Sequence, residues 1–206
     1  MNSKRRILIA ALAAAPFAGA RAQPKFNFGE LKPSQPVDSG SKIEVLEFFW
    51  YGCIHCYNLE PVIEAWLKKL PADVQFRRVP AVFNERWGHD AAIFYAFEAM
   101  GVLDKLHRPF FDAIHRDRLR TDSKPALTEW LQKNGVDLKK FEDNMKSFGV
   151  QSKLRRATQQ TVAYKIDGTP SLAVQGRYTV SADQGGSREG MMATVDHLVE
   201  LARKQK

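Results

Sequence analysis

The chain has 206 residues, of which 44% are hydrophobic, and its formal net charge is +8, from 31 Lys and Arg against 23 Asp and Glu. The basic residues are scattered among acidic ones and form no stripe, so we expect no nucleic-acid-binding surface. The only two cysteines, Cys53 and Cys56, are too few for a fold stabilised by several disulfides.

Residues 1–22 have the three parts of a secretory signal peptide: a basic start at residues 4–6, an apolar run at 7–15, and small residues at Ala20 and Ala22. The apolar run is too short to span a bilayer. We therefore expect cleavage after Ala22; an uncleaved membrane anchor is the alternative, and the paired arginines also resemble a twin-arginine signal. The segment holds four of the 31 basic residues and no acidic ones, which leaves 27 against 23, or +4, on the other 184 residues. That length suffices for one domain with an insertion.

The first strands follow an irregular segment. Residues 23–41 are rich in Pro, Ser and Gly and are expected to form only one short strand, near residues 26–31. The next run, KIEVLEFFW at residues 42–50, is dense in β-branched and aromatic side chains. This composition predicts a central strand that is buried on both faces and ends just before the two cysteines.

A helix is expected to begin at or near Cys53. Apolar residues recur after Cys56 at the i, i+3, i+4, i+7 spacing of an amphipathic helix. Pro61 lies inside this pattern and should kink the helix without ending it, because the apolar stripe continues on the same face. Residues 74–83 predict the following strand, which stops at Pro80.

Residues 86–164 are helical in pattern throughout, with Gly, Asn, Asp and Ser at the breaks. Asp90 is expected to begin the first helix, which ends at Gly101. Four more helices are expected: around 103–114, from Asp122 or Ser123 to Asn134, from Asp137 through Met145, and from about Gln151 to Tyr164. Such a block indicates a helical insertion into a chain that otherwise contains strands.

The C-terminal region returns to strands. Residues 171–180 predict two strands around a Gln175-Gly176 turn, followed by a loop at residues 185–186. Ser187 is a suitable N-cap for a last helix, whose apolar face repeats every three or four residues.

The spacing of the two cysteines indicates reactivity. A Cys-x-x-Cys disulfide closes too short a loop to stabilise a fold much, so stability is a poor reason for the pair. At a helix N-terminus, unpaired backbone N–H groups and the helix dipole would stabilise a Cys53 thiolate and lower its pKa below the free value of about 8.5. A protonated or hydrogen-bonding His55 would lower that pKa further. Cys56, one turn into the helix, is close enough to resolve a mixed disulfide formed on Cys53.

The order of strand, Cys-x-x-Cys, kinked helix, helical block, and GTPS (168–171) before the last hairpin and helix resembles the thioredoxin superfamily, specifically the DsbA-type periplasmic thiol:disulfide oxidoreductases. The segment EFFWYGCIHCYNLE, residues 47–60, is similar to the active-site segment of that family, with His55 and Tyr57 in matching positions. The usual Pro-His pair of the family is Ile54-His55 here. The resemblance covers almost the whole chain after the signal peptide.

This resemblance implies an α/β fold. Residues 23–85 and 165–206 would form a thioredoxin-like domain, a central mixed β-sheet flanked by helices, and residues 86–164 an inserted all-helical domain. It implies a periplasmic monomer that donates its Cys53–Cys56 disulfide to newly exported, unfolded proteins with free cysteines. A DsbB-like inner-membrane quinone reductase would reoxidise it. The resemblance implies no cofactor and no metal.

The resemblance also implies that the Thr169-Pro170 bond is cis and faces the cysteines, which would leave Thr169 free to bind an extended substrate backbone. An ordinary trans bond is the alternative from base rates, since only about 5% of X-Pro bonds are cis.

Glu47 interrupts the predicted buried strand six residues before Cys53 and has two interpretations. It is either a buried carboxyl group that carries protons to and from Cys56, as the family suggests, paired with Arg78, or a structural ion pair with Arg77 or Arg78 or an exposed strand position.

Three other functions compete with the disulfide donor. A disulfide isomerase or reductant of the same fold would share Thr169 before the proline, but isomerases carry an N-terminal dimerisation domain, and only some 20 residues here lie between the signal peptide and the first main strand. A metal-binding module would need four ligands for zinc, and the chain has no second cysteine pair. A chaperone or scaffold with an incidental Cys-x-x-Cys would keep its function in Cys53→Ala.

Overall fold

The computed structural model describes residues 26–205, so the expected signal peptide and its cleavage after Ala22 lie outside the described residues. A five-stranded sheet with the order β1-β5-β4-β2-β3 forms the centre. The strands are β1 (Gly29–Glu30), β2 (Ile43–Phe49), β3 (Val74–Pro80), β4 (Ser171–Val174) and β5 (Tyr178–Ser181). Because β2 pairs parallel with β3 and antiparallel with β4, the sheet is mixed, as predicted.

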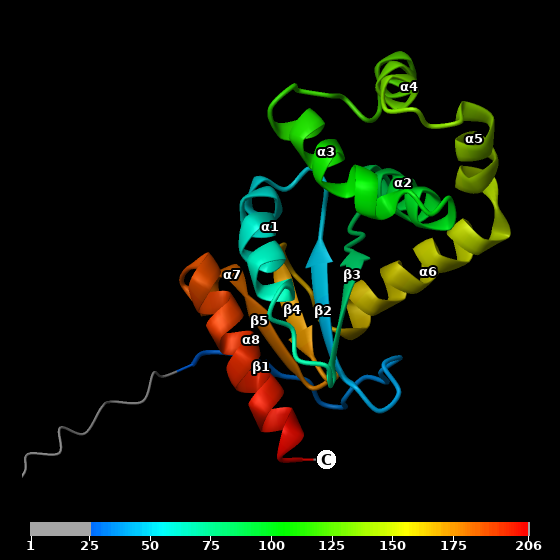
Figure 1. Cartoon of the computed structure of the whole chain (residues 1–206). Helices are drawn as coiled ribbons and strands as arrows, with labels where there is room; N and C mark the ends of the chain where they lie inside the picture. Colours follow the sequence, from blue (N-terminus) through cyan, green and yellow to red (C-terminus); the bar gives the residue numbers. More distant parts are fainter. Residues whose placement is uncertain (1–25, 206) are drawn as a thin grey trace, which may run out of the picture.

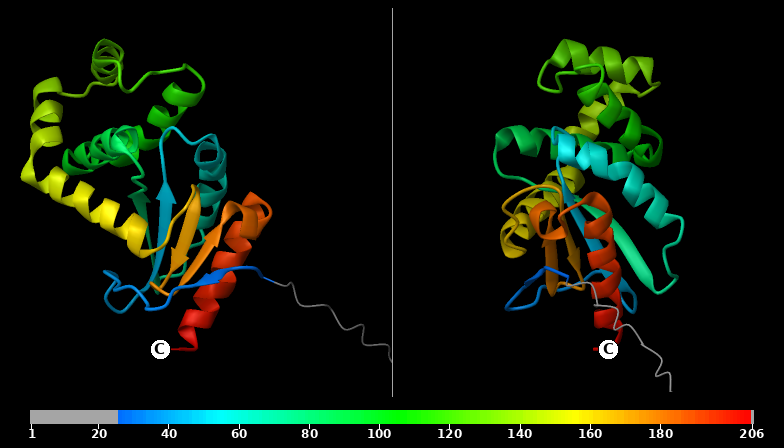
Figure 2. Two further views of the ribbon diagram at one scale, coloured as in Figure 1. Left: turned by 180° about the vertical axis from the view of Figure 1, so that it is seen from behind. Right: turned by 90° about the vertical axis from the view of Figure 1, so that its left-hand side faces the viewer.

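Helices flank this sheet on both faces (Figure 1, Figure 2). α1 (Ile54–Leu67) and α8 (Arg188–Arg203) share one apolar core with the sheet, and a second core joins the opposite face to the helices between β3 and β4. Those helices are α2 (Glu85–Ala99), α3 (Leu103–His115), α4 (Lys124–Lys133), α5 (Leu138–Lys146) and α6 (Phe148–Ala163). No helix among residues 26–205 is both long enough and apolar enough to cross a bilayer.

Most of the predicted elements are present close to their expected bounds. The strand at residues 42–50 is β2, every residue of which is buried, and the helix after Cys53 continues through Pro61 to Leu67. The 171–180 hairpin turns at Gln175 and Gly176, both with positive φ (52° and 62°), the backbone conformation of a two-residue hairpin turn.

Three predicted element bounds were wrong. α6 begins at Phe148, not at about Gln151, because the Ser147 side chain accepts a hydrogen bond from the Val150 N–H and caps the helix earlier. α2 begins at Glu85, not at Asp90, because the side chain of Asn84 accepts a hydrogen bond from the Trp87 N–H and caps the helix earlier. The predicted loop at residues 185–186 is partly helical: Gly185 ends a one-turn helix, α7 (Ala182–Gly185), which a capping box formed by Ser181 stabilises.

The alternation of side chains along β2 positions the residues near the cysteines. Ile43 and Val45 pack against α1 and α8, and Glu47 points to the same face because side chains two apart share a face of a strand. The carboxyl end of β2 leads into the turn before α1, and α2 to α5 lie beyond this end of the sheet (Figure 1). Glu47 and the start of α1 are therefore neighbours beneath the helices that follow β3.

Candidate active site

The two cysteines occupy different environments at the start of α1. Cys53 is the N-cap of the helix, in an extended conformation (φ −86°, ψ 115°), and its N–H donates to the Trp50 carbonyl over 3.0 Å. Its side chain is half-buried, whereas Cys56, in the first turn, is fully buried. Both are free thiols here, so the structure represents the reduced protein. The predicted placement of Cys53 at a helix N-terminus is confirmed.

The sulfur of Cys53 is surrounded by groups that stabilise a thiolate. A hydrogen bond from the Cys56 thiol is the largest cause that lowers the pKa of Cys53, to about 5. Partial burial opposes this shift, while the Thr169 side chain and the backbone N–H groups of Cys56 and His55 add to it. Cys53 thus carries a thiolate at neutral pH, which is the reactive form of a cysteine.

The sulfur of Cys56 behaves in the opposite way. Burial is the main cause that raises the pKa of Cys56 well above its usual range, and the neighbouring charges of Cys53 and Glu47 raise it further. Cys56 therefore stays protonated while Cys53 is ionised, and its proton is shared with the Cys53 sulfur.

His55 contributes to this arrangement through its backbone. The His55 N–H is the group that lowers the pKa of Cys53, whereas the imidazole is exposed. Together with Pro170, Arg188 and Met191, His55 lines a cavity of about 330 Å³ beside the cysteines. The expected effect of the imidazole on Cys53 stays a prediction.

The segment before β4 lies against Cys53. The Thr169-Pro170 peptide bond is cis, and the Sγ atom of Cys53 lies 3.2 Å from the Thr169 carbonyl oxygen, which accepts a hydrogen bond from the Cys53 thiol when that thiol is protonated. The cis geometry and its position facing the cysteines, both implied by the family resemblance, are present in the structure.

Glu47 is a fully buried carboxyl group beneath the cysteines. Its Oε2 lies 3.1 Å from Nε of Arg78, as an ion pair, yet neither Glu47 oxygen has a hydrogen bond within the described chain. Burial, and then the negative charge of Glu60, raise the pKa of Glu47 to about 8, although Arg78 opposes the shift. Arg77 instead pairs with Glu44 and Asp38, which eliminates it as the partner of Glu47. An exposed position for Glu47 is likewise eliminated.

A buried polar chain next to Glu47 was missed from the sequence. Arg78 donates to both carboxylate oxygens of Glu60 (3.2 and 2.8 Å), and Nε2 of His107 lies 3.2 Å from Glu60 Oε1. Nδ1 of His107 lies 2.9 Å from the Tyr51 hydroxyl. The spacing of Cys56 and Glu60, four residues apart on one helix face, was the only local signal for this chain.

The charges of this chain follow from its contacts. Burial alone would raise the pKa of Glu60, but the hydrogen bond from His107 and the charge of Arg78 outweigh it and the pKa is lowered. Burial lowers the pKa of His107, which is therefore neutral. Because the Glu60 carboxylate can only accept, Nε2 of His107 carries the proton and Nδ1 accepts from Tyr51. The buried cluster thus holds one cation, one carboxylate, and Glu47 as a second carboxyl group that is largely protonated at neutral pH.

No group of three or more His, Cys, Asp or Glu side chains within residues 26–205 has the arrangement of a metal site. The chemistry that the geometry allows is that of the sulfurs: an accessible, ionised Cys53, a protonated Cys56 within reach of it, and a protonated carboxyl group below.

Comparisons with known proteins agree with this chemistry. A family model described as a DSBA-like thioredoxin domain matches residues 79–193. The thiol:disulfide interchange protein DsbA of Azotobacter vinelandii is 42% identical over 174 residues, 84% of this chain and 81% of the relative. The DsbA protein of Bordetella parapertussis is 41% identical over 203 residues, 97% of each chain.

Solved structures agree as well. The crystal structure of Pseudomonas aeruginosa DsbA superposes with a TM-score of 0.83 at 36% identity and covers 87% of this chain and 94% of that chain. Because the similarity spans nearly the full length of relatives well above 30% identity, the chain belongs to the DsbA family: it is a thiol:disulfide oxidoreductase with a thioredoxin-like fold.

Proposed function

We propose that the chain is a periplasmic monomer that oxidises newly exported, unfolded proteins by donating its Cys53–Cys56 disulfide. The opposite protonation of the two cysteines carries this proposal. A Cys53 thiolate with a pKa of about 5 stabilises the reduced form of the pair, and no such gain exists in the disulfide. A protein whose reduced form is stabilised in this way readily transfers its disulfide to other thiol pairs and so acts as an oxidant.

The proposed reaction has two exchange steps. A client thiolate attacks the Cys53 sulfur of the oxidised protein, the Cys53–Cys56 bond breaks, and Cys56 leaves with the electron pair and takes up a proton. A second client thiolate then attacks the client sulfur of the mixed disulfide, and Cys53 leaves as a stable thiolate. The client loses two electrons and two protons; the cysteine pair gains the two electrons and one proton, on Cys56, and the second proton goes to solvent.

Glu47 is proposed to supply the proton that Cys56 takes up. It is the carboxyl group whose charge acts on both cysteines, and at neutral pH it holds a proton because its pKa is raised to about 8. Arg78 contacts Glu47 and is itself held by the ionised Glu60, so the position of Glu47 is fixed while it keeps its proton. The alternative, a purely structural ion pair with Arg78, predicts no kinetic effect of removing the carboxyl group.

Thr169, Pro170 and His55 are proposed to bind the client near its cysteine. Thr169 and Pro170 lie against Cys53, so an extended client backbone that reaches this sulfur must pass them. His55 and Pro170 line the adjacent cavity, which continues to the start of α8.

The proposal also includes export of the protein, its reoxidation and its domain organisation. Residues 1–22 would direct export and be removed, and a DsbB-like inner-membrane partner would return the two electrons to quinone. Residues 86–164 would form the helical domain inserted between the two parts of the thioredoxin-like domain, 23–85 and 165–206. The family to which the chain belongs supports these assignments.

A redox titration of the purified protein against glutathione tests the function. We expect a reduction potential at least ~60 mV more positive than that of thioredoxin, which lies near −270 mV; each ~30 mV corresponds to a tenfold change in the equilibrium constant. A potential close to that of thioredoxin would instead favour the reductant of the same fold.

A further inference from the structure

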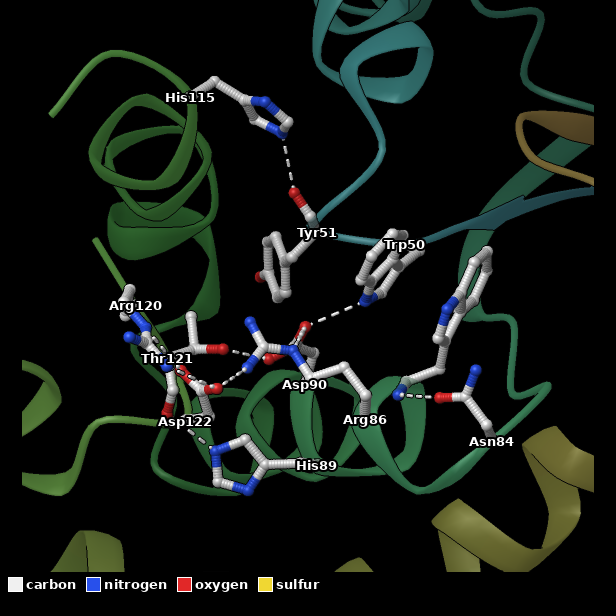
Figure 3. A network of polar contacts seen from close by, with 11 residues as sticks. Trp50, Tyr51, Asn84, Arg86, His89, Asp90, His115, Arg120, Thr121 and Asp122 are labelled. Atoms are coloured by element: carbon white, nitrogen blue, oxygen red, sulfur yellow. Dashed lines mark hydrogen bonds and ion pairs between the residues drawn. The ribbon is translucent and has the colours of Figure 1, made fainter. Parts of the chain in front are cut away.

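Asp90 is a buried carboxylate that the proposed reaction does not use. It lies on α2 and is 1% exposed. Its two oxygens have separate partners: Oδ2 accepts from the Trp50 indole N–H over 2.8 Å, and Oδ1 accepts from the Thr121 hydroxyl over 2.5 Å. Arg86, one turn earlier on α2, lies 3.5 Å from Oδ2 and also pairs with Asp122. One side chain thus joins α2, the segment between α3 and α4, and the residues before Cys53 (Figure 3).

The group that Asp90 holds, Trp50, begins the pre-cysteine turn, residues 50–53. The Trp50 carbonyl accepts the Cys53 N–H and so closes this turn directly before α1. The indole covers Gly52 so closely that a Cβ atom at that residue would lie 2.3 Å from an indole carbon. The indole of Trp50 also stacks on the indole of Trp87, with ring centroids 4.3 Å apart and an angle of 13°. The position of the indole therefore determines the position of the turn beneath it.

The helices between β3 and β4 also hold the second residue of the turn. Nε2 of His115, on α3, donates to the Tyr51 carbonyl over 2.8 Å, and the Tyr51 hydroxyl bonds to His107. Figure 3 shows Asp90 and His115 reaching Trp50 and Tyr51 from two different helices. Side chains of both α2 and α3 thus hold the turn that presents Cys53.

We propose that Asp90 is a positioning residue for Cys53: by anchoring the Trp50 indole to α2, it fixes the pre-cysteine turn so that the Cys53 sulfur faces the backbone N–H groups of α1. The helices after β3 then contribute to the reactivity of Cys53 through a hydrogen bond, without touching the sulfur. This inference rests on the proposed function, in which Cys53 is the attacked and released sulfur.

Three variants of the full reduced protein test the inference by thiolate absorbance near 240 nm against pH and by the rate of Cys53 alkylation at pH 5. Trp50→Phe keeps an aromatic ring for the stack and removes the indole donor, and Asp90→Ala removes the acceptor. Each should raise the pKa of Cys53 by about half a unit to one unit, the size expected from one hydrogen bond, and slow alkylation severalfold. The double variant should show no larger shift than either single variant, because both remove the same bond.

Two controls separate positioning from general stability. Asp90→Asn can still accept from Trp50 with its amide oxygen and donate to the Thr121 oxygen with its amide nitrogen, so we expect a Cys53 pKa close to that of the parent. Trp66→Phe removes an indole–carboxylate bond of similar length, to Asp196, between α1 and α8 and should leave Cys53 unchanged. Urea unfolding of each variant shows whether the fold persists; should Asp90→Ala not fold, Trp50→Phe tests the same bond.

The outcomes are distinct. If Trp50→Phe titrates and alkylates like the parent, or shifts no more than Trp66→Phe, Asp90 has no positioning role, although the proposed function stands. If the parent itself shows a Cys53 pKa near the free value of about 8.5, the proposed function fails first. A shift in Trp50→Phe and Asp90→Ala that Asp90→Asn does not share supports the inference.

Discussion

The surroundings of Cys53 and the buried cluster beneath it have opposite electrostatic effects. The first keeps a sulfur ionised, and the second keeps a carboxyl group protonated. At the surface, hydrogen bonds from uncharged donors, the Cys56 thiol and backbone N–H groups, stabilise the charge on Cys53. In the interior, Arg78 balances Glu60, and Glu47 remains largely protonated at neutral pH because one cation does not stabilise two buried carboxylates. Oriented dipoles suit a sulfur that must gain and lose its charge in each cycle, whereas a buried neutral carboxyl group suits storage of a proton.

The largest expected effect comes from replacing each cysteine separately, because the two sulfurs have different roles. Cys56→Ala leaves the accessible Cys53 sulfur able to form mixed disulfides but removes the resolving thiol, so covalent complexes with clients should accumulate and turnover should fall by at least ~10³-fold. Cys53→Ala should form almost no complexes, because the remaining thiol is buried and protonated. Non-reducing gels of protein mixed with an activated disulfide peptide measure both. Equal complex formation by the two variants would contradict the division of roles.

Glu47→Gln tests whether the buried carboxyl group of Glu47 supplies a proton to Cys56. If Glu47 gives its proton to Cys56 as that sulfur leaves, the variant should form mixed disulfides with a client thiol at least ~10-fold more slowly at pH 7, since general acids contribute factors of this size or larger. Stopped-flow measurement of the exchange with a model peptide reports this rate. Glu44→Gln is the matched control: Glu44 is a buried carboxyl group on the opposite face of β2, paired with Arg77. Equal rates in the two variants would favour the structural ion pair.

The free energy of unfolding of Glu47→Gln should also depend on pH differently from that of the parent. The pKa of Glu47 is about 8 in the folded protein and near 4.5 when unfolded, so the folded state binds the additional proton and loses stability as pH rises through this window. Gln cannot ionise. The free energy of unfolding of Glu47→Gln relative to the parent should therefore increase by roughly 1–3 kcal/mol between pH 4.5 and pH 8, measured by urea unfolding. A constant difference across these pH values would mean that the folded carboxyl group is ionised throughout.

The two regions were not equally predictable from the sequence. The position of Cys53 follows from local patterns, because the apolar spacing after Cys56 identifies the helix and its start. The largest cause of the low Cys53 pKa, the hydrogen bond from the Cys56 thiol, depends on side-chain orientation, whereas the sequence pattern predicted only the helix end and His55 as causes. Local patterns predict where the sulfur lies better than which donors surround it.

The buried cluster depends on contacts between distant segments. His107 is 47 residues from Glu60, and only the packing of α3 on α1 brings the two together. Asp90 was likewise misread from local sequence, because an acidic residue before an apolar run resembles an N-cap. In the structure Asn84 is the N-cap, and Asp90 is buried and accepts a hydrogen bond from Trp50. The pairing of Glu47 with Arg78 was expected from the family resemblance, with Arg77 as an alternative, and the register of β2 and β3, which places Glu47 opposite Arg78, decides between the two.

The smallest expected effect concerns a single donor at the surface. Thr169→Val keeps the shape of the side chain and the carbonyl contact to Cys53 but removes the hydroxyl, one of several groups that lower the pKa of Cys53. We expect that pKa to rise from about 5 by up to about one unit, so the thiolate fraction at pH 5 should fall about two- to fivefold. Absorbance near 240 nm measures it, and Thr158→Val, on the exposed face of α6, is the control. Because a lowered pKa stabilises the reduced form only above that pKa, the variant should be a weaker oxidant at pH 7 and equal to the parent well below pH 5. An unchanged pKa in Thr169→Val would mean that the Cys56 thiol and the backbone of α1 hold the thiolate without help from the segment before β4.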